Sequence, residues 1–502
     1  MTQHFAKIIC CLLLGSMVLT VTAADFLITE FGARPGPQSL NTVPINKAIE
    51  ACASNGGGRV VIPAGTFRSG TILMKNHVEL HLEAGAVLLA SSDIKDFPLQ
   101  PQPTYRSQKD PGGWRALIYA NEVAHIAITG LGTIDGNGAK QKPDKNAKHG
   151  SDMDGRPRNI LFISCSDIRI SGINMRNAGI WNQHYLNCEE VMVDRINVYN
   201  HANRNNDGID IDGCRRFVLS NSIFDTDDDA IVLKSTGAAG CEDVTITNCT
   251  VSSFCNAIKA GTESTGGFKN ITISNCVIKP STNKQPPIYG TARGITALSL
   301  EIVDGGVMEG ISISNIVIEG TACPLYIRLA NRARKHTDAA PDPPVGAMRN
   351  IVISNITAYN TGNYCSSITG ISGHYVENVT LSNIQFFHKG GLKAGDFIVD
   401  IQQVKEDEKG YPQPTVWKEL PSSGLFIRHA RNIQINGLLL GALVSDPRIP
   451  VIAVDTEGLQ IKTIGRVTHS DAPVFCKGWQ VNDIQVDPPL GWNKKVIEIE
   501  NN

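Results

Sequence analysis

A short motif recurs through the middle of the chain at regular spacing. Six copies alternate apolar and polar residues and end in Asn: Val218–Asn221, Val244–Asn248, Ile271–Asn275, Ile311–Asn315, Ile351–Asn355 and Val379–Asn383. Their final Asn residues follow one another after 27, 27, 40, 40 and 28 residues. Weaker copies lie at Ile126–Gly130, Ile168–Gly172, Val191–Asp194 and Ile433–Gly437. The alternation is typical of half-buried strands, and Asn or Gly tolerates the left-handed backbone of a sharp turn.

These spacings fit the coils of a parallel β-helix. Roughly 22 to 27 residues supply three short strands with their turns, and equivalent positions then stack about 4.8 Å apart. The 40-residue spacings imply loops inserted between strands. A β-propeller needs four strands per repeat, and a TIM barrel needs helices that this sequence lacks. We therefore predict an all-β fold, a right-handed parallel β-helix, with a short capping helix at Val43–Ala53.

The N-terminus has the features of a secretory signal peptide. Lys7 precedes the apolar segment Ile8–Val21, and Thr22–Ala24 supplies small residues before Asp25. We predict a signal peptide at 1–24, a single β-helix domain at 25–502, and a secreted or periplasmic location. A retained membrane anchor is the alternative. No later apolar run reaches the ~18 residues of a membrane span.

Composition narrows the possible partners. The formal charge of −2 gives no reason to expect nucleic acid, and 42% hydrophobic with 19% charged residues excludes a disordered chain. Removing Cys10 and Cys11 from the 13 cysteines leaves an odd number, so no tight disulfide framework is expected. Cys249 and Cys276 share a repeat position and should stack inside, where even a disulfide is geometrically allowed. No zinc-type spacing of ligands occurs, so we expect no metal. We also expect no cofactor and a monomer.

Acidic residues concentrate in Asn205–Asp212 and Asp225–Asp229. Asp207 precedes Asp228 and Asp229 by 21 and 22 residues, about one short coil, which places all three on one face of neighbouring coils. Carboxylates this close cannot all ionise easily, so one pKa should rise. A protonated carboxyl beside an ionised one can hydrolyse a glycosidic bond. A solvated acidic turn and a calcium site are the alternatives.

The same segments resemble two signature motifs of the polygalacturonase family, glycoside hydrolase family 28. They are Asn205–Asp210 and Thr226–Ser235. The family's opening coil is similar to Phe31–Ala33, Ala48–Cys52, Gly56–Phe67 and Leu80–Ala86. The similarity runs from about Phe31 to about Gly465. It implies a pectin-lyase-like solenoid and an inverting hydrolase of acidic pectic polysaccharides, of the galacturonan or rhamnogalacturonan type.

The resemblance also implies roles for individual residues. Asp228 would be the general acid that protonates the leaving oxygen. Asp207 and Asp229 would hold and deprotonate the attacking water. Asn205 would position that site. An inverting reaction needs about 6.5–9.5 Å between acid and base, a spacing that neighbouring coils can supply.

Two family motifs are missing from this chain. Gly-His-Gly aligns with Cys255–Glu263, so that Asn256 stands where the family has His. Arg-Ile-Lys should fall within Arg293–Glu301, which lacks the basic pair suited to a galacturonate carboxylate. We therefore expect a different sugar at the cleavage point: a rhamnogalacturonan linkage, another uronic acid or a decorated pectin side chain. Asn256, Lys259 and Glu263 are the candidate substrate contacts, with ordinary surface charges as the alternative for the last two.

Other candidates are single residues or loops. Trp181–His184 resembles a Trp-x-x-His of bacterial family members, which would place His184 in the cleft as a substrate contact; a structural histidine is the alternative. Lys234 follows Asp228 at an even offset and would share its face in a regular strand. Arg328, Arg332 and Arg334 form a basic loop that could hold an anionic polysaccharide or simply be solvated. Gly391–Pro421 breaks the repeat and predicts a long loop.

Two other functions stay open at this point. A calcium-dependent polysaccharide lyase would use the Asp cluster for calcium and a basic residue to remove a proton next to a uronic carboxylate. A non-catalytic carbohydrate-binding β-helix would bind without turnover. For a hydrolase, the loops implied by the 40-residue repeats slightly favour exo action, because they could close one end of the cleft.

Overall fold

The computed structural model describes residues 25–110, 114–142, 155–283 and 293–500. The predicted signal peptide, residues 1–24, lies outside these ranges. Within them, no helix is long and apolar enough to cross a membrane.

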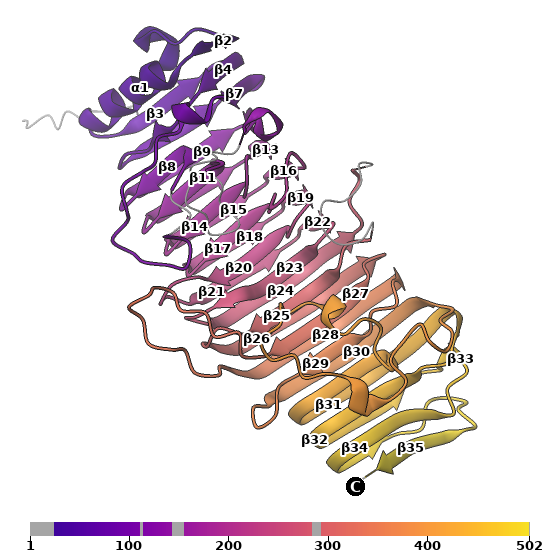
Figure 1. The fold of residues 1–502 in the computed structure, drawn as a ribbon. Coiled ribbons are helices and arrows are strands. Elements are labelled where there is room, and N and C mark those ends of the chain that lie inside the picture. The colour runs from indigo at the N-terminus through magenta and orange to yellow at the C-terminus, as the bar shows by residue number, and fades with distance from the viewer. Residues whose placement is uncertain (1–24, 111–113, 143–154, 284–292, 501–502) are drawn as a thin grey trace, which may run out of the picture.

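The chain forms the predicted right-handed parallel β-helix, an elongated stack of coils running from the N-terminal cap to the C-terminus (Figure 1). Strands of successive coils pair in parallel, as β18 (Arg215–Ser220) does with β21 (Cys241–Thr247). The helix α1 (Thr42–Ser54) covers the first coil, which confirms the predicted cap. Its apolar face, including Ile45 and Ile49, is buried against that coil.

Three sheets, here called A, B and C, run along the stack. Besides β18 and β21, sheet A contains β1 (Asp25–Leu27), β3 (Gly58–Ile62), β6 (Val78–Leu82), β9 (Ala124–Gly130), β12 (Ser166–Ser171) and β15 (Glu189–Asp194). Sheet B contains β2 (Gly36–Leu40), β4 (Gly65–Ser69), β7 (Ala86–Ala90), β10 (Thr133–Asp135), β13 (Asn174–Arg176), β16 (Asn197–Asn200), β19 (Ile223–Thr226) and β22 (Thr250–Ser253). Sheet C contains β5 (Ile72–Leu73), β8 (Ala116–Asn121), β11 (Arg158–Ile163), β14 (Gln183–Leu186), β17 (Ile209–Asp212), β20 (Ile231–Ser235), β23 (Asn256–Ser264), β25 (Thr296–Ile302), β27 (Cys323–Leu329) and β29 (Ser366–Thr369).

Longer strands in the C-terminal half continue around the corners between sheets. They are β24 (Phe268–Lys279), β26 (Val307–Glu319), β28 (Ala347–Thr361), β30 (Val376–Gly390), β31 (Ser422–Asp446), β32 (Ile449–Ile464) and β34 (Val474–Val486). The shorter β33 (Thr468–Ser470) lies between β32 and β34, and β35 (Lys495–Glu500) follows β34. Short 3-10 helices are η1 (Ile28–Phe31), η2 (Ile94–Asp96), η4 (Gly138–Lys140), η5 (Ile401–Gln403) and η6 (Pro414–Val416).

The interior is a continuous column of apolar side chains. Ile246, Ile273 and Ile313 occupy aligned positions of successive coils and are buried. Cys249 and Cys276 are likewise buried in adjacent coils, as their shared repeat position predicts, and both are free thiols. Alternate residues therefore fill the core while their neighbours face outward.

The repeated Asn forms a ladder on the outer surface. Asn275, Asn315, Asn355 and Asn383 have φ angles of 54 to 57°, in the left-handed region. Nδ2 of Asn355 donates to Oδ1 of Asn315 at 3.1 Å, and Nδ2 of Asn383 donates to Oδ1 of Asn355 at 3.0 Å. Asn therefore provides both the turn conformation and a bond to each neighbouring coil.

This ladder gives a stability prediction. Replacing Asn355, with its φ of 54°, by Ala removes two side-chain hydrogen bonds and puts a β-carbon into a left-handed turn. We expect Asn355→Ala to lower the unfolding free energy by about 1–3 kcal/mol, measured by chemical denaturation. Asn355→Gly removes the same bonds without the steric penalty, so it should lose less. Equal losses in the two variants would contradict the conformational part of this explanation.

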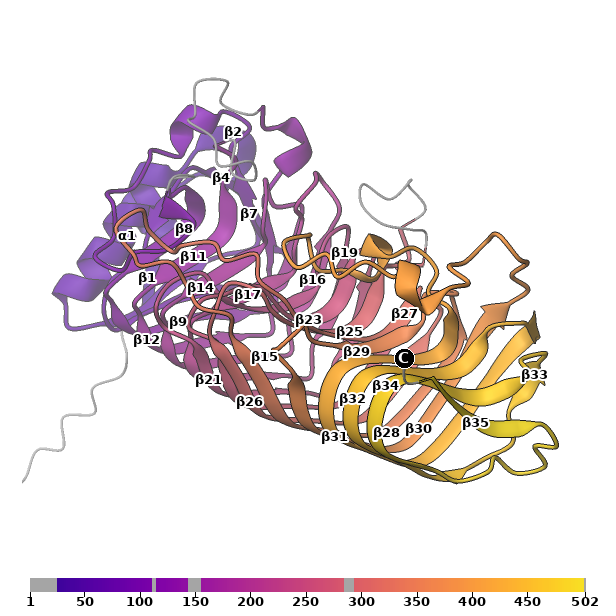
Figure 2. The same ribbon diagram turned by 60° about the horizontal axis from the view of Figure 1, so that its bottom comes forward.

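Two long loops fold back over sheet C. In the connection between β7 and β8, Ser107 forms an antiparallel bridge with Gly237, and Oη of Tyr105 accepts from the amide of Ala239 at 2.9 Å. The other loop is the predicted break at Gly391–Pro421, which contains η5 and η6 (Figure 2). Its Trp417 packs in one cluster with Tyr326 of β27. The loops bring distant parts of the chain to the middle of sheet C.

Candidate active site

A cavity of about 430 Å³ lies where both loops meet the middle of sheet C. Its lining includes Lys109 from the first loop and Tyr411 and Gln413 from the second. The remaining lining side chains come from the coils and their turns: Trp181, Asn205, Asp207, Asp228, Asp229, Lys234, Cys255, Glu263, Ile295, Arg332 and Arg334. The cavity is therefore lined by Asp207, Asp228 and Asp229, the three aspartates that the sequence indicates as catalytic candidates.

Stacked turns position these aspartates. Asp207 lies just before β17, and Asp229 lies at the equivalent place before β20. The amide of Gly208 donates to the carbonyl of Asp229 at 3.0 Å, which joins the two turns. Asn205, with a φ of 55°, donates from Nδ2 to Oδ2 of Asp228 at 3.4 Å. One-coil spacing thus places the three carboxyl groups side by side, with Asn205 bonded to one of them.

Asp228 is set up to retain a proton. Burial raises its pKa to about 6, and the neighbouring charge of Asp229 adds to this effect, while Lys259 opposes it. The backbone amide of Asp229 donates to Oδ1 of Asp228 at 2.9 Å. An acid with this pKa is protonated in mildly acidic solution and can donate its proton to a leaving group.

Asp229 is held in the ionised form. Burial alone would raise its pKa, but Lys259 and Lys234, together with the side chain of Asn256, more than offset burial and lower it. Nζ of Lys259 lies 3.2 Å from Oδ2, and Nδ2 of Asn256 donates to Oδ1 at 2.6 Å. Two adjacent carboxyl groups therefore have pKa values shifted in opposite directions, as an acid and a base require.

Asp207 differs from Asp229. Burial, and then the charges of Asp210 and Asp228, raise its pKa well above the ordinary value. Asp210, in β17, is fully buried, and neither of its oxygens has a hydrogen-bond partner among the described residues, although Nζ of Lys234 lies 3.6 Å from its Oδ1. Burial raises the pKa of Asp210 to about 7, against the opposing charge of Lys234. Asp210 belongs to the same motif as Asp207, but the spacing that relates Asp207 to Asp228 and Asp229 does not distinguish it as a site residue.

Lys234 and Glu263 both line the cavity. Nζ of Lys234 lies 3.5 Å from Oε2 of Glu263, whose Oε1 lies 3.2 Å from Nζ of Lys109. Trp181 lies beneath the two ammonium groups, which are 4.9 and 5.0 Å from its ring centre. These residues form a charged wall next to the aspartates.

Asn256 and Lys259 lie behind the cavity rather than in its lining. Each is 1% exposed. Nζ of Lys259 contacts Asp229 and is 3.9 Å from Oε2 of the buried Glu301. Oη of Tyr411 lies 3.2 Å from the same ammonium. The geometry corrects their expected role as substrate contacts: both side chains position Asp229.

His184 and Arg328 are also displaced from their expected roles. His184 is fully buried, with Nε2 3.0 Å from Oδ2 of Asp212 and its ring edge-on to Trp181. Burial lowers its pKa to about 4. Arg328 donates to the carbonyls of Gly370 and Glu406. Neither side chain lines the cavity, so the first supports Trp181 and the second fastens the loop that carries Tyr411.

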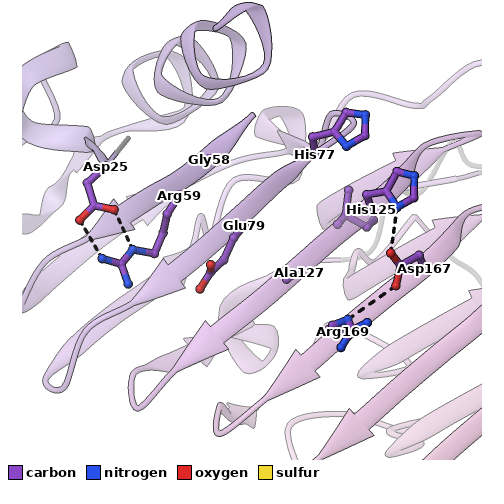
Figure 3. A pocket seen from close by; sticks show the side chains of 10 residues that line it. Asp25, Gly58, Arg59, His77, Glu79, His125, Ala127, Asp167 and Arg169 are labelled. Carbon is purple, nitrogen blue, oxygen red and sulfur yellow. Dashed lines mark hydrogen bonds and ion pairs between the residues drawn. The ribbon is translucent and has the colours of Figure 1, made fainter. Parts of the chain in front are cut away.

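A second cavity, of about 480 Å³, lies on sheet A near the N-terminus (Figure 3). Arg59 pairs with Asp25, and His125 and Arg169 contact Asp167. Hydrogen bonds from Arg59 and from His125 lower the pKa values of Asp25 and Asp167 respectively. These two carboxyl groups are held in the ionised form, unlike Asp228 in the first cavity.

The donor set of the first cavity is poor for calcium. Among the described residues, Asp228, Asp229 and Cys255 each offer one atom, all within 4.8 Å of one another. Calcium prefers six to eight oxygen ligands, and a thiol is not one of its usual donors. The ammonium of Lys259 already contacts Asp229. The arrangement favours acid/base chemistry over metal binding.

Known proteins with similar sequences are polygalacturonase-type proteins, in agreement with the two aspartate motifs of the sequence. Residues 52–406 match the family model described as glycosyl hydrolases family 28. A probable polygalacturonase of Vitis vinifera is 30% identical over 217 residues, covering 41% of this chain and 44% of that protein. An exo-poly-alpha-D-galacturonosidase of Dickeya chrysanthemi is 28% identical over 263 residues, covering 43% of each. The chain thus spans less than half the length of these curated relatives.

A solved structure has a similar fold. The exopolygalacturonase from Thermotoga maritima superimposes with a TM-score of 0.60 at 20% identity, covering 82% of this chain and 92% of that one. At this identity the likeness concerns the fold alone. The family match, in contrast, covers well over half of the sequence, including the coils that carry Asp207, Asp228 and Asp229. The chain belongs to glycosyl hydrolases family 28.

Proposed function

We propose that the protein is a glycoside hydrolase that cleaves an acidic pectic polysaccharide of the galacturonan or rhamnogalacturonan type. One observation carries this proposal: Asp228 and Asp229 lie side by side in one cavity, with pKa values raised and lowered respectively. Names of the relatives support the substrate class. The test is turnover on purified homogalacturonan, rhamnogalacturonan and debranched fragments. No turnover on any of them would contradict the proposal.

The three aspartates divide the reaction between them. Asp228, protonated below about pH 6, gives its proton to the leaving glycosidic oxygen. Asp229, ionised, takes a proton from the water that attacks the anomeric carbon. Asp207, whose pKa is raised, holds that water through its carboxyl group. The sugar gains the hydroxyl of the water, and the leaving group gains a hydrogen.

Stereochemistry needs a separate test. The family resemblance implies inversion, but oxygens of Asp228 and Asp229 within 4.8 Å are closer than the 6.5–9.5 Å usual between the acid and base of inverting enzymes. If the attacking water is held on the side of Asp207, inversion is compatible with the short distance between Asp228 and Asp229. Proton NMR of the first-formed product decides: inversion gives the anomer opposite to the bond cleaved, and retention gives the same anomer.

We also propose exo action. Lys109 and Tyr411 reach the cavity from loops on different coils, so the open groove of sheet C is narrowed to a pocket. A pocket of about 430 Å³ suits the end of a chain better than its middle. The first detectable products should be single residues or short fragments with little loss of polymer viscosity. A rapid fall in viscosity would contradict exo action.

The pH dependence follows from the two shifted groups. Since the acid must be protonated, kcat/KM should fall as pH rises through about 6, the pKa of Asp228. The acidic limb should lie below pH 3.8, because Asp229 must stay ionised and its pKa is lowered. Initial rates measured from about pH 3 to about pH 9 test both limbs. Activity that keeps rising above pH 7 would contradict the assignment of Asp228.

The alternatives predict different products. A lyase would release unsaturated sugars and lose activity with a chelator, and a binding protein would retain the polysaccharide without turnover.

The predicted signal peptide supports a secreted or periplasmic location, and we propose a monomer. The location is tested by looking for the protein in the culture medium and the periplasmic fraction. The oligomeric state is tested by measuring its mass in solution, which should be that of one chain.

A further inference from the structure

Arg332 is a cavity residue with one hydrogen-bonding group left over. Its Nε donates to Oδ1 of Asp304 at 2.9 Å, and its Nη2 donates to Oδ2 of the same carboxylate. Nη1 is buried and has no hydrogen-bond partner within the described residues. The side chain is 6% exposed and lines the cavity that contains Asp228. Leaving a buried donor unpaired costs free energy, so a ligand that supplies an acceptor is favoured there.

Asp304 fixes the orientation of this guanidinium. It is fully buried, and its carboxylate also accepts from the amide of Arg334 at 3.0 Å and from Nε2 of Gln108 at 3.4 Å. Its own amide donates to Oγ of Ser264 at 2.9 Å. A guanidinium held by two hydrogen bonds to a fixed carboxylate has little conformational freedom left to lose when it binds a ligand.

The charge of the cavity favours an anion. Its lining within the described residues includes the cations Lys109, Lys234, Arg332 and Arg334 and the acids Asp207, Asp228, Asp229 and Glu263. Two of these acids, Asp207 and Asp228, have raised pKa values. When both hold protons, as the acid role of Asp228 requires of that residue, four cations face two carboxylates. Asp304, behind the lining, pairs with Arg332 and offsets part of this excess, and an anionic sugar balances the remaining positive charge better than a neutral one.

We propose that Nη1 of Arg332 binds the carboxylate of a uronic acid residue next to the bond that Asp228 helps to break, and so selects an acidic sugar. This inference rests on the proposed function. Arg332 lies beyond β27, so the contact replaces the missing Arg-Ile-Lys pair from a different coil. At the aligned position, Arg293 instead donates to the carbonyls of Gly320 and Asn360. A planar guanidinium and a carboxylate form a strong charge-assisted hydrogen bond.

The test combines a protein change with a ligand change. We would measure kcat/KM of the wild type and Arg332→Gln on an oligogalacturonide and on its methyl ester, which lacks the negative charge. The wild type should prefer the acid by about 10- to 100-fold, the value of a hydrogen bond between charged groups. Arg332→Gln should lose that preference, through a lower rate on the acid alone. An unchanged acid-to-ester ratio would overturn the proposal.

Controls separate charge recognition from folding. Arg349→Gln is the matched control, because Arg349 pairs with Glu309 on the outer surface, and it should keep the wild-type ratio. If Arg332→Gln does not fold, the double variant with Asp304→Asn removes the buried partner charge as well and should again lose the preference. Thermal unfolding of each variant reports on the fold.

A binding experiment distinguishes failure of this inference from failure of the proposed function. If the wild type cleaves neither fragment, the proposed hydrolysis is wrong, and calorimetry with galacturonate, galactose and galactose sulfate still tests Arg332. Galacturonate should bind more tightly than galactose, and Arg332→Gln should abolish the difference. Equal binding of galacturonate and galactose would overturn the inference. Tighter binding of the sulfate would overturn the assignment to a carboxylate.

Discussion

Replacing Asp228 by Asn should reduce kcat by about 10²- to 10⁴-fold, the usual contribution of a general acid. The amide keeps the size of the side chain and can still accept from the backbone amide of Asp229, now 2.9 Å from Oδ1. It cannot release a proton to the leaving oxygen. The loss should therefore fall on kcat, with the thermal unfolding temperature close to that of the wild type.

The pH profile gives this variant a second readout. The decline of kcat/KM above about pH 6 should disappear, because the group responsible for it is gone. Asp243→Asn is a matched control: Asp243 lies on the outer surface, with its Oδ1 accepting from Asn270, and its φ of 56° suits Asn. Near-normal turnover in Asp228→Asn would contradict the role given to Asp228.

Lys259→Met should affect both stability and activity strongly. The ammonium of Lys259 is 3.2 Å from Asp229 and 3.9 Å from Glu301, and all three side chains are buried. Removing one partner of a buried ion pair leaves charge without compensation and costs about 3–5 kcal/mol of unfolding free energy. The pKa of Asp229 should rise once Lys259, the charge that does most to lower it, is lost.

The sign of the pH effect distinguishes positioning from substrate contact. A higher pKa of Asp229 moves the acidic limb of kcat/KM to higher pH, because the base then protonates earlier. Lys269→Met is the matched control: Lys269 pairs with Glu242 at 3.2 Å, is 59% exposed, and should change stability by less than about 1 kcal/mol. A variant of Lys259 that changes only KM would contradict the positioning role.

The periodic parts of the molecule could be predicted from the sequence. The Asn-terminated motif identified the coil because Asn355 and its five equivalents each occupy a left-handed turn. The offset of 21 and 22 residues brought Asp207 to Asp228 and Asp229 because stacked coils repeat their geometry at each step. Both inferences depend only on local pattern and stacking.

The burial of sheet C could not be predicted in the same way. His184 and Lys259 occupy equivalent positions in successive strands of sheet C. His184 pairs with Asp210, Asp210 with Val232, and Val232 with Lys259. The sequence indicated their place in the coil but not what covers them. Lys259 is reached by Tyr411, and that loop has no periodicity from which its path could be inferred.

The same limitation explains the cavity residues that the sequence did not indicate. Lys109 and Gln413 come from connections whose composition resembles ordinary surface loops. Arg332 stood in a recognisable basic run, but only the structure distinguishes it from Arg328, which binds backbone carbonyls away from the cavity. Insertions are positioned by long-range contacts such as the bridge of Ser107 with Gly237.

The most direct test of the acid/base account is the mass of the products formed in ¹⁸O-labelled water, with and without a chelator. Hydrolysis by Asp228 and Asp229 predicts one ¹⁸O atom for each bond cleaved, at the newly formed reducing end, at a rate that the chelator does not change and that Asp228→Asn nearly abolishes. Unsaturated products without the label, lost when the chelator is present, would contradict the account and make this cavity the site of an elimination reaction.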